Sequence, residues 1–420
     1  MKLPGQVTGV SGGIIMPVAI AQPFLSRRDI EKVYPHLERR FLDPQVYLTE
    51  LDGRTCGDAC ANLASFGWFG VAPIAFDSTK QKQNDWKAKA RKQIGKRWTG
   101  RVPTAANDIE DSIRVTLEFQ AKLGCEGLIL PAPLTTDIDT DYAAELQWLD
   151  LGLSLAPQID PDRPRFATIA ISDTCLRRLS PWSNSLLNEI VDQVSARQPE
   201  GVYIIVEQAN EQGYYCTHKN TVGSLLRLVH GLKRGGIRYV LVGFAGTVGL
   251  LCVAVGADGW STAWGLSERR LRLDAFERTG RAFPAFYSHA FAGEFHMQND
   301  LDEVVAGGFL DRIADVTPAS AGLVKALETG KKASSVPEWR FRVNNTTASK
   351  EHFLHVMVRE TANLARLSVP DRIRAAETWL DSAAALVDDL STIGRFNDRT
   401  SISHQHNWRA ALTDHVANAR

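Results

Sequence analysis

Short apolar runs alternate with longer amphipathic segments from residue 66 to about residue 264. The runs have the length of strands and are apolar throughout, rather than at every second position. Strands of this kind are buried on both faces, as in a parallel sheet that helices cover. The predicted strands span residues 68–76, 126–134, 165–172, 201–208, 238–246 and 260–264.

The segments between these runs have the apolar spacing of helices. In the first of them, Ile109, Ile113 and Leu117 recur every fourth position, and Gly124 provides a stop signal. Ser183 or Asn184 can cap a later one by accepting a hydrogen bond from the first turn. The predicted helices span residues 108–124, 141–156, 183–197 and 221–236, with a short one within 247–259.

This alternation, with further strand candidates near residues 14–19 and 282–288, favours a (β/α)8 barrel of the TIM type. A doubly wound open sheet is the second choice, because no G-x-G-x-x-G follows the first strand. After about residue 335 the pattern changes to two amphipathic helices, 348–368 and 370–393, separated by Pro370. We expect a barrel over residues 1–335, with an N-terminal extension and a basic insertion at 78–101, and a helical subdomain over 336–420.

Charge is balanced overall and concentrated locally. The chain of 420 residues carries 48 basic and 48 acidic residues, so bulk charge does not direct it to nucleic acid or membrane. Residues 77–101, however, hold nine Lys or Arg against two Asp. A helix with such a stripe and nearby Trp86 and Trp98 suits contact with a phosphate backbone and base stacking. The alternative is a solvated helix at the rim of the barrel, although such helices usually also carry Glu.

The cysteines and the apolar runs indicate where in the cell the protein is expected. No C-x-x-C occurs among the six Cys, which favours buried reduced thiols in a cytoplasmic protein over disulfides or zinc. The stretch "IIMPVAIA" resembles a short signal sequence, but Pro17 interrupts it, and we expect a strand or loop there. No run is long enough to span a bilayer, and we expect no membrane partner.

Chemistry in a barrel lies at the carboxyl ends of the strands, which directs attention to residues 77–78, 131–136, 172–173, 207–211, 243–247 and 261–264. Asp77 can serve as a general acid or base there, or as a helix cap. Glu207 and Glu211 form a carboxylate pair that suits cleavage of an N-glycosidic bond, or else an ion pair in a loop. The turn that contains Gly243, Gly246 and Thr247 can bind phosphate, or simply permit a tight turn.

Histidines supply weaker candidates. His352 and His355 lie one helical turn apart, a spacing that can bind metal, but no full ligand set accompanies them. We therefore predict no metal and no cofactor, and leave metal binding at this pair open.

Several stretches share their order with a known family: "AFDSTKQ" (75–81), "EFQAKLGCEGLILPAP" (118–133), "RFATIAISDTCLRRLS" (165–180), "EGVYIIVEQANEQ" (200–212), residues 237–270 and residues 352–380. Together they resemble the tRNA-guanine transglycosylase superfamily over about residues 66–390. The resemblance implies a barrel, a base-sized pocket, and base-reading or catalytic roles for Asp77, Ser78 and Glu211. The nucleophilic Asp of the family falls near Ser261, where no carboxylate stands, and Asp258 is the nearest one. The zinc cluster of the family is absent.

These observations lead to three hypotheses. The first is a glycosyltransferase-like protein that acts at or binds an N-glycosidic base site in a nucleotide or nucleic acid. The second is a catalytically inactive nucleic-acid-binding subunit that works with a protein partner or as a homodimer, and the third is a barrel enzyme for a small phosphorylated metabolite. Catalysis is assigned to Asp77, Glu207, Glu211 and Asp258. Substrate or phosphate binding is assigned to Ser78, Lys80, Lys82, Lys87, Arg91, Lys92, Lys96, Arg97, Gly243, Gly246, Thr247 and Ser261.

Overall fold

The computed structural model describes residues 12–19, 39–49, 51–64, 102–208, 215–263, 269–276, 282–297, 299–394, 396–397 and 400–419. Three sequence predictions lie outside these ranges: the strand at 68–76, the basic segment with Asp77 and Ser78, and Glu211.

A five-stranded parallel sheet lies at the centre of the described chain, in the order β3–β4–β5–β6–β7. Its members are β3 (Leu128–Ile129), β4 (Arg165–Ser172), β5 (Gly201–Glu207), β6 (Tyr239–Gly243) and β7 (Gly259–Trp260). β4 and β5 are buried along almost their whole length, as expected of apolar strands covered on both faces. The predicted mixed α/β class with a parallel sheet is confirmed.

A second parallel pair extends this order. β1 (Gly13–Pro17) pairs with β2 (Arg39–Asp43). The amide of Glu126, just before β3, donates to the carbonyl of Arg40 over 2.8 Å, which places β2 beside β3. In the described part of the chain, each strand from β1 to β7 therefore lies next to the one before it.

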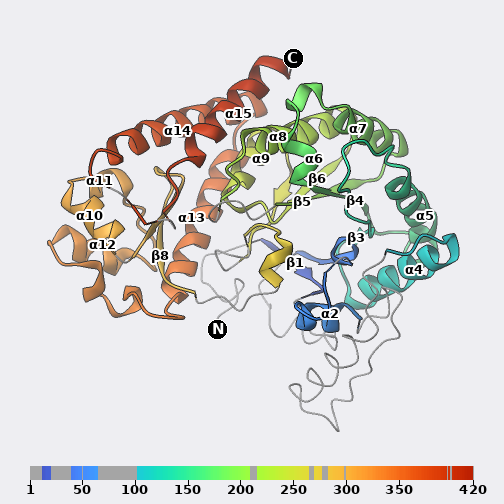
Figure 1. Ribbon diagram of the computed structural model, residues 1–420, viewed down its shortest axis with the longest axis horizontal. Helices are drawn as coiled ribbons and strands as arrows, with labels where there is room; N and C mark the ends of the chain where they lie inside the picture. Colours follow the sequence, from blue (N-terminus) through green and yellow to red (C-terminus); the bar gives the residue numbers. More distant parts are fainter. Residues whose placement is uncertain are drawn as a thin grey trace, which may run out of the picture.

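Helices connect consecutive strands and lie outside the sheet (Figure 1). α7 begins after Asn184, whose side chain accepts from the amide of Leu186, and α4 ends at Gly124 in the left-handed conformation (φ 71°). The main helices are α4 (Ala106–Leu123), α5 (Ala143–Ile159), α7 (Ser185–Arg197), α8 (Lys219–Arg234) and α9 (Gly249–Ala254), which confirm the predicted ones, with the shorter α2 (Gly57–Ala64) and α6 (Asp173–Arg177).

Large rings and glycines alternate across one face of the strands. Phe41 of β2 contacts Phe166 of β4 edge-on with ring centroids 5.3 Å apart, and Phe166 stacks on Tyr239 of β6 at 6.2 Å. The strands between them carry glycine at this level. A Cβ on Gly201 would lie 2.4 Å from the Phe166 ring, and one on Gly127 would lie 2.6 Å from it. The glycines therefore make room for the neighbouring rings.

The C-terminal module, defined here as β8–β9 with α10–α14, lies beside the sheet (Figure 1). Its strands β8 (Ala285–Ser288) and β9 (Gly293–His296) form an antiparallel hairpin. A second apolar core spans Phe286 to Phe396, so it begins well before residue 336. The helices are α10 (Asp300–Ala306), α11 (Leu310–Ile313), α12 (Ala321–Glu328), α13 (Thr347–Ala365) and α14 (Val369–Leu390), followed by α15 (His404–Asn418), which packs on α8 and α14.

One predicted strand pairs differently from the expectation. The run near residues 282–288 forms β8, but within the described residues it pairs only with β9. The prediction that it adds to the parallel sheet is wrong, because the chain turns back within a few residues and a short turn joins antiparallel strands. Pro370 lies in the first turn of α14, as predicted.

Two further expectations concern cysteine and membrane. All six Cys are buried and none is part of a disulfide, as the sequence predicted. Within the ranges that the structure describes, no helix combines the length and the apolar character needed to cross a bilayer.

Candidate functional site

Polar side chains meet where β4 and β5 end. Ser172 and Glu207 are the last residues of these strands and lie opposite each other in the ladder. The Ser172 hydroxyl donates to Oε2 of Glu207 over 2.7 Å. The backbone of Thr135 joins the same edge, because its carbonyl accepts from the amide of Ser172. This carboxyl-end site is where a parallel α/β protein is expected to bind its ligand.

The carboxyl of Glu207 holds its proton more tightly than an ordinary glutamic acid. Burial is the main cause of its raised pKa, and the negative charges of Asp173 and Asp274 add to it. The hydrogen bond from Ser172 and the positive charge of Arg177 act in the opposite direction. A carboxyl with a raised pKa is a better proton donor candidate than an ordinary glutamic acid.

The neighbouring helix α6 supplies a second carboxylate. Asp173 is its first residue, and its Oδ1 lies 3.7 Å from Nε of Arg177 one turn later. The side chain of Ser172 caps this helix by accepting from the amide of Thr174. The end of β4 therefore positions two groups beside Glu207, a hydroxyl and a carboxylate.

A segment that follows β7 lies against the end of β5. We call residues 269–276 the strap. The amide of Gln208 donates to the carbonyl of Leu271 over 2.9 Å, and Leu271 forms a parallel bridge with Glu207. Arg270 donates to the carbonyl of Tyr215 over 2.7 Å and approaches the side chain of Gln208. Sequence reasoning missed the strap, because it contains no apolar run that would predict a strand.

A second buried carboxyl lies deeper, at the end of β2. Asp43 is fully buried, and burial raises its pKa from 3.8 to about 7. Tyr47 donates to its Oδ2 over 2.5 Å, and Tyr203 of β5 donates to the same oxygen over 3.1 Å. The amide of Gln45 donates to Oδ1. Sequence reasoning missed Asp43, since "RRFLD" is too polar to predict a buried strand.

Two predicted site residues have other roles: Asp258 lies away from Glu207, and Gly243 allows close packing. Asp258 precedes β7 at the amino end of the sheet, where Oδ2 accepts from Lys233 over 3.0 Å and from the amide of Val240 over 2.8 Å. A Cβ on Gly243 would lie 2.4 Å from the hydroxyl of Tyr203, so glycine at this position makes room for that ring. Asp258 and Glu207 are therefore at opposite ends of the sheet.

The remaining part of the glycine turn is covered. Gly246 (φ 53°) and Thr247 are buried, and Gly246 lies against Arg269. Ser261 follows β7 and stays partly exposed, with its amide bonded to the carbonyl of Val242. Arg269 therefore covers the turn at Gly246.

A pocket beside the site is small. Val206, Gln208, Cys216 and Gly243 line it with residues of α8, and its volume is about 10 Å³. This space holds about one water molecule. These residues do not form the base-sized pocket that the family resemblance implies.

His352 has a structural role. Its Nε2 donates to the carbonyl of Tyr287 over 2.8 Å, and its Nδ1 lies 3.0 Å from the hydroxyl of Thr317. Burial lowers its pKa to about 4. Both ring nitrogens are occupied, and no group of three or more His, Cys, Asp or Glu that suits a metal ion occurs within the described ranges.

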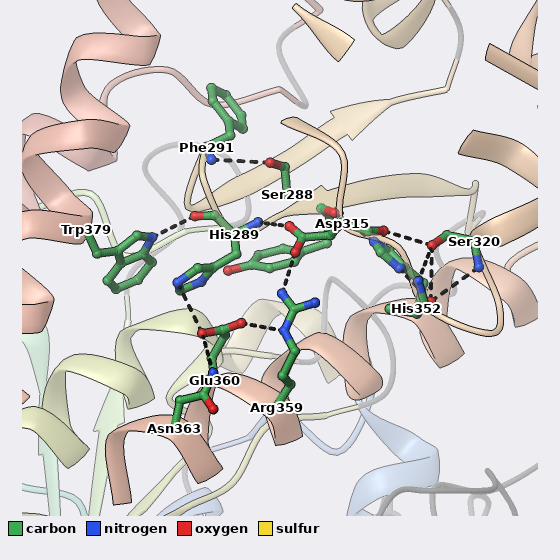
Figure 2. A network of polar contacts seen from close by, with 12 residues as sticks. Ser288, His289, Phe291, Asp315, Ser320, His352, Arg359, Glu360, Asn363 and Trp379 are labelled. Atoms are coloured by element: carbon green, nitrogen blue, oxygen red, sulfur yellow. Dashed lines mark hydrogen bonds and ion pairs between the residues drawn. The ribbon is translucent and has the colours of Figure 1, made fainter. Parts of the chain in front are cut away.

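A polar network ties the turn of the β8–β9 hairpin to α13 and α14 (Figure 2). The amide of His289 donates to Asp315 over 2.6 Å, and the indole of Trp379 donates to the carbonyl of His289 over 2.6 Å. The imidazole stacks on Trp379 with ring centroids 4.7 Å apart, and its Nε2 lies 3.5 Å from Glu360. Arg359 bonds both Asp315 and Glu360. The hairpin is thereby held at its turn.

The predicted basic residues, Ser78 and two predicted catalytic residues have no described position. They are Asp77, Ser78, Lys80, Lys82, Lys87, Arg91, Lys92, Lys96, Arg97 and Glu211. Of the predicted catalytic residues, the structure places Glu207 at the carboxyl-end site and Asp258 at the other end of the sheet.

Comparison with models of known protein families, with curated proteins and with solved structures found no match. The site geometry and the sequence pattern therefore carry the functional argument.

Proposed function

We propose that this chain forms a (β/α)8 barrel and acts at, or binds, an N-glycosidic base site in a nucleotide or nucleic acid. The observation that carries the proposal is Glu207, a carboxyl of raised pKa at the end of a central strand, bonded to Ser172 and beside Asp173. In a barrel, that position faces the substrate.

Three observations support the barrel. Strands β1 to β7 are neighbours in chain order, and right-handed crossovers then place every connecting helix on one face, which leads to closure. Tyr203 of β5 reaches Asp43 of β2, although β3 and β4 separate these strands in the sheet. The rings of Phe41, Phe166 and Tyr239 come from alternate strands, as the layers inside a barrel do.

The chemistry follows from the two carboxyl groups. Glu207 would give its proton to the base nitrogen as the C–N bond breaks, and the base would leave with the bonding electron pair. Asp173 would stabilise the positive charge that develops on the sugar. Water would then add to the sugar carbon and return a proton to Glu207. This route forms no covalent intermediate, and it therefore needs no nucleophilic carboxylate at position 261, where the chain has Ser261.

The substrate class rests on the charge of residues 77–101. A stretch with nine Lys or Arg and two Asp suits an anionic partner, and the phosphates of a nucleic acid supply one. We propose DNA, RNA or a nucleotide as that partner.

One observation favours a second candidate function, a binding subunit without catalysis. Asp258, the carboxylate nearest to the expected nucleophile position, is held by Lys233 and the amide of Val240 at the amino end of the sheet. Such a subunit would hold nucleic acid for an active partner protein.

The test is base release from nucleosides and oligonucleotides by the purified protein. Glu207→Gln should lower the rate by at least about 100-fold, because one general acid contributes about that much. Glu126→Gln, an exposed carboxylate before β3, is the control and should leave the rate unchanged. Equal rates in both variants would refute catalysis by Glu207.

Binding is measured separately by filter retention of labelled oligonucleotides. Charge reversal at Lys87, Arg91 and Lys96 should abolish retention. Retention without base release in the wild-type protein would favour the binding subunit, and unchanged retention in the reversed variant would refute both functions.

A further inference from the structure

The strap is attached on both sides. On one side its backbone pairs with Glu207 and Gln208. On the other side the side chain of Arg269, its first residue, contacts the C-terminal module. Its Nη1 donates to Oε1 of Glu294 on β9 over 2.9 Å. The two side chains are only 5% and 2% exposed, so the ion pair is shielded from water.

The aromatic neighbour of Arg269 comes from the same module. Its guanidinium lies 3.3 Å from the ring centroid of Phe353 on α13. Cation–π contact of this kind strengthens when water is excluded. One side chain therefore joins the strap to both the hairpin and α13.

The hairpin that carries Glu294 is itself fixed. Figure 2 shows its turn bonded through His289 to Asp315 and Trp379, with Arg359 and Glu360 of α13 completing the network. The network at the turn, the paired backbone of the hairpin and the ion pair of Arg269 with Glu294 thus link α13 and α14 to the strap beside Glu207.

We propose that the C-terminal module positions the carboxyl-end site, with Glu294 and Arg269 as the positioning residues. Glu294 holds Arg269, Arg269 holds the strap, and the strap excludes water from one side of Glu207. Asp274 of the strap also places a negative charge near Glu207. Movement of the hairpin would loosen the strap and expose Glu207, so the module can regulate the site. This inference relies on the proposed function only for the role of Glu207.

The first test is hydrogen exchange of the full-length protein, followed by mass spectrometry. The amide of Gln208 reports the strap, because its partner is the carbonyl of Leu271, and the amide of Ile169 in β4 reports the sheet. Glu294→Gln should accelerate exchange at Gln208 by about tenfold or more and leave Ile169 unchanged, since losing one member of a buried pair promotes local opening. The control Asp389→Asn breaks an exposed ion pair with Arg312 in the same module and should change neither.

The double variant Arg269→Met/Glu294→Gln covers the case in which the single variant unfolds. Removing both charges leaves no unpaired buried ion, so the sheet should stay protected while Gln208 exchanges fast. Slow exchange at Gln208 in the folded double variant would overturn the proposal. Loss of protection at Ile169 in both variants would also overturn it, because the pair would then only maintain the fold.

The second readout is the titration of Glu207, followed by infrared difference spectra between proteins with Glu and with Gln at position 207. Glu294→Gln should move this titration to lower pH, because water reaches the carboxyl. A role of Glu294 confined to the stability of the module would not move it, and an unchanged titration contradicts positioning. Neither readout requires base release. The proposed function can therefore fail in the base-release assay while this inference stands. Equally, this inference can fail in the exchange and titration experiments while base release is observed.

Discussion

Asp43 should make the stability of the protein depend on pH in a direction opposite to that of most carboxylates. The side chain is fully buried and accepts hydrogen bonds from Tyr47, Tyr203 and the amide of Gln45. No cation is among these partners, so burial dominates and raises the pKa from 3.8 to about 7. Between about pH 4 and pH 7 the folded protein therefore holds a proton that the unfolded chain has released.

The size of the effect follows from the two pKa values. Their difference of about 3 corresponds to about 4 kcal/mol. Between pH 4 and pH 7 the folded state binds one proton more than the unfolded state, so the free energy of unfolding falls by about 1.4 kcal/mol for each pH unit of increase. This contribution of Asp43 is fully present below pH 4 and is lost as the pH rises through 7.

The change Asp43→Asn removes the titration. Its effect is measured by urea unfolding, followed by tryptophan fluorescence, at pH 5 and pH 8. The free energy of unfolding of the variant, relative to the wild type, should increase by about 3 kcal/mol from pH 5 to pH 8. Any constant cost of replacing the carboxyl by an amide is the same at both pH values and cancels, as do the contributions of the histidines.

Asp162→Asn changes an exposed carboxylate in a turn and serves as the control, with less than about 0.5 kcal/mol of difference between the two pH values. If Asp43→Asn shows the same relative stability at pH 5 and pH 8, the carboxyl is ionised in the folded protein at both. The argument from burial would then be refuted.

Three further predictions concern strand packing, helix capping and the loss of stability at low pH. Gly201→Ala should lower the free energy of unfolding in urea by about 3 kcal/mol, because the new Cβ would lie 2.4 Å from the Phe166 ring. Adding Phe166→Leu to this variant should recover part of the loss in the same assay. Asn184→Ala removes the cap of α7 and should cost about 1 kcal/mol in the same assay, whereas no loss would show that the cap is unimportant. His404 has a pKa lowered by burial to about 4, so the unfolded chain binds more protons between pH 4 and 6.5 and stability falls as the pH falls through that range. His404→Gln should reduce the slope of unfolding free energy against pH by about 1.4 kcal/mol per unit, and an unchanged slope would contradict the buried neutral imidazole.

Helices and central strands could be predicted because their signals are local. β4 and β5 are continuous apolar runs, and α4 repeats apolar residues on one face, so neighbouring residues alone indicate the element. The end of α4 at Gly124 and the cap of α7 at Asn184 could be predicted for the same reason, since a left-handed residue and an amide cap each act within one helical turn.

The pairing of distant residues could not be predicted in the same way. Arg269 and Glu294 meet only because the β8–β9 hairpin packs against the strap, and Asp43 meets Tyr203 across the strands between them. No regular spacing or motif in the sequence indicates either contact. The strand β2 was also missed, because Arg39 and Arg40 give it a polar start although Asp43 at its end is buried.

The packing of α15 has a consequence for synthesis of the protein. Trp408 donates to the carbonyl of Cys216 over 2.7 Å, and Asn407 donates to that of Thr217 over 2.7 Å, so α15 covers the start of α8. The ribosome completes the parallel sheet long before it reaches residue 404. Until then this face of α8 has no cover, and apolar surface on an incomplete chain attracts chaperones and proteases. Nascent chains that stop short of residue 404 should therefore be cleaved first near residues 215–234.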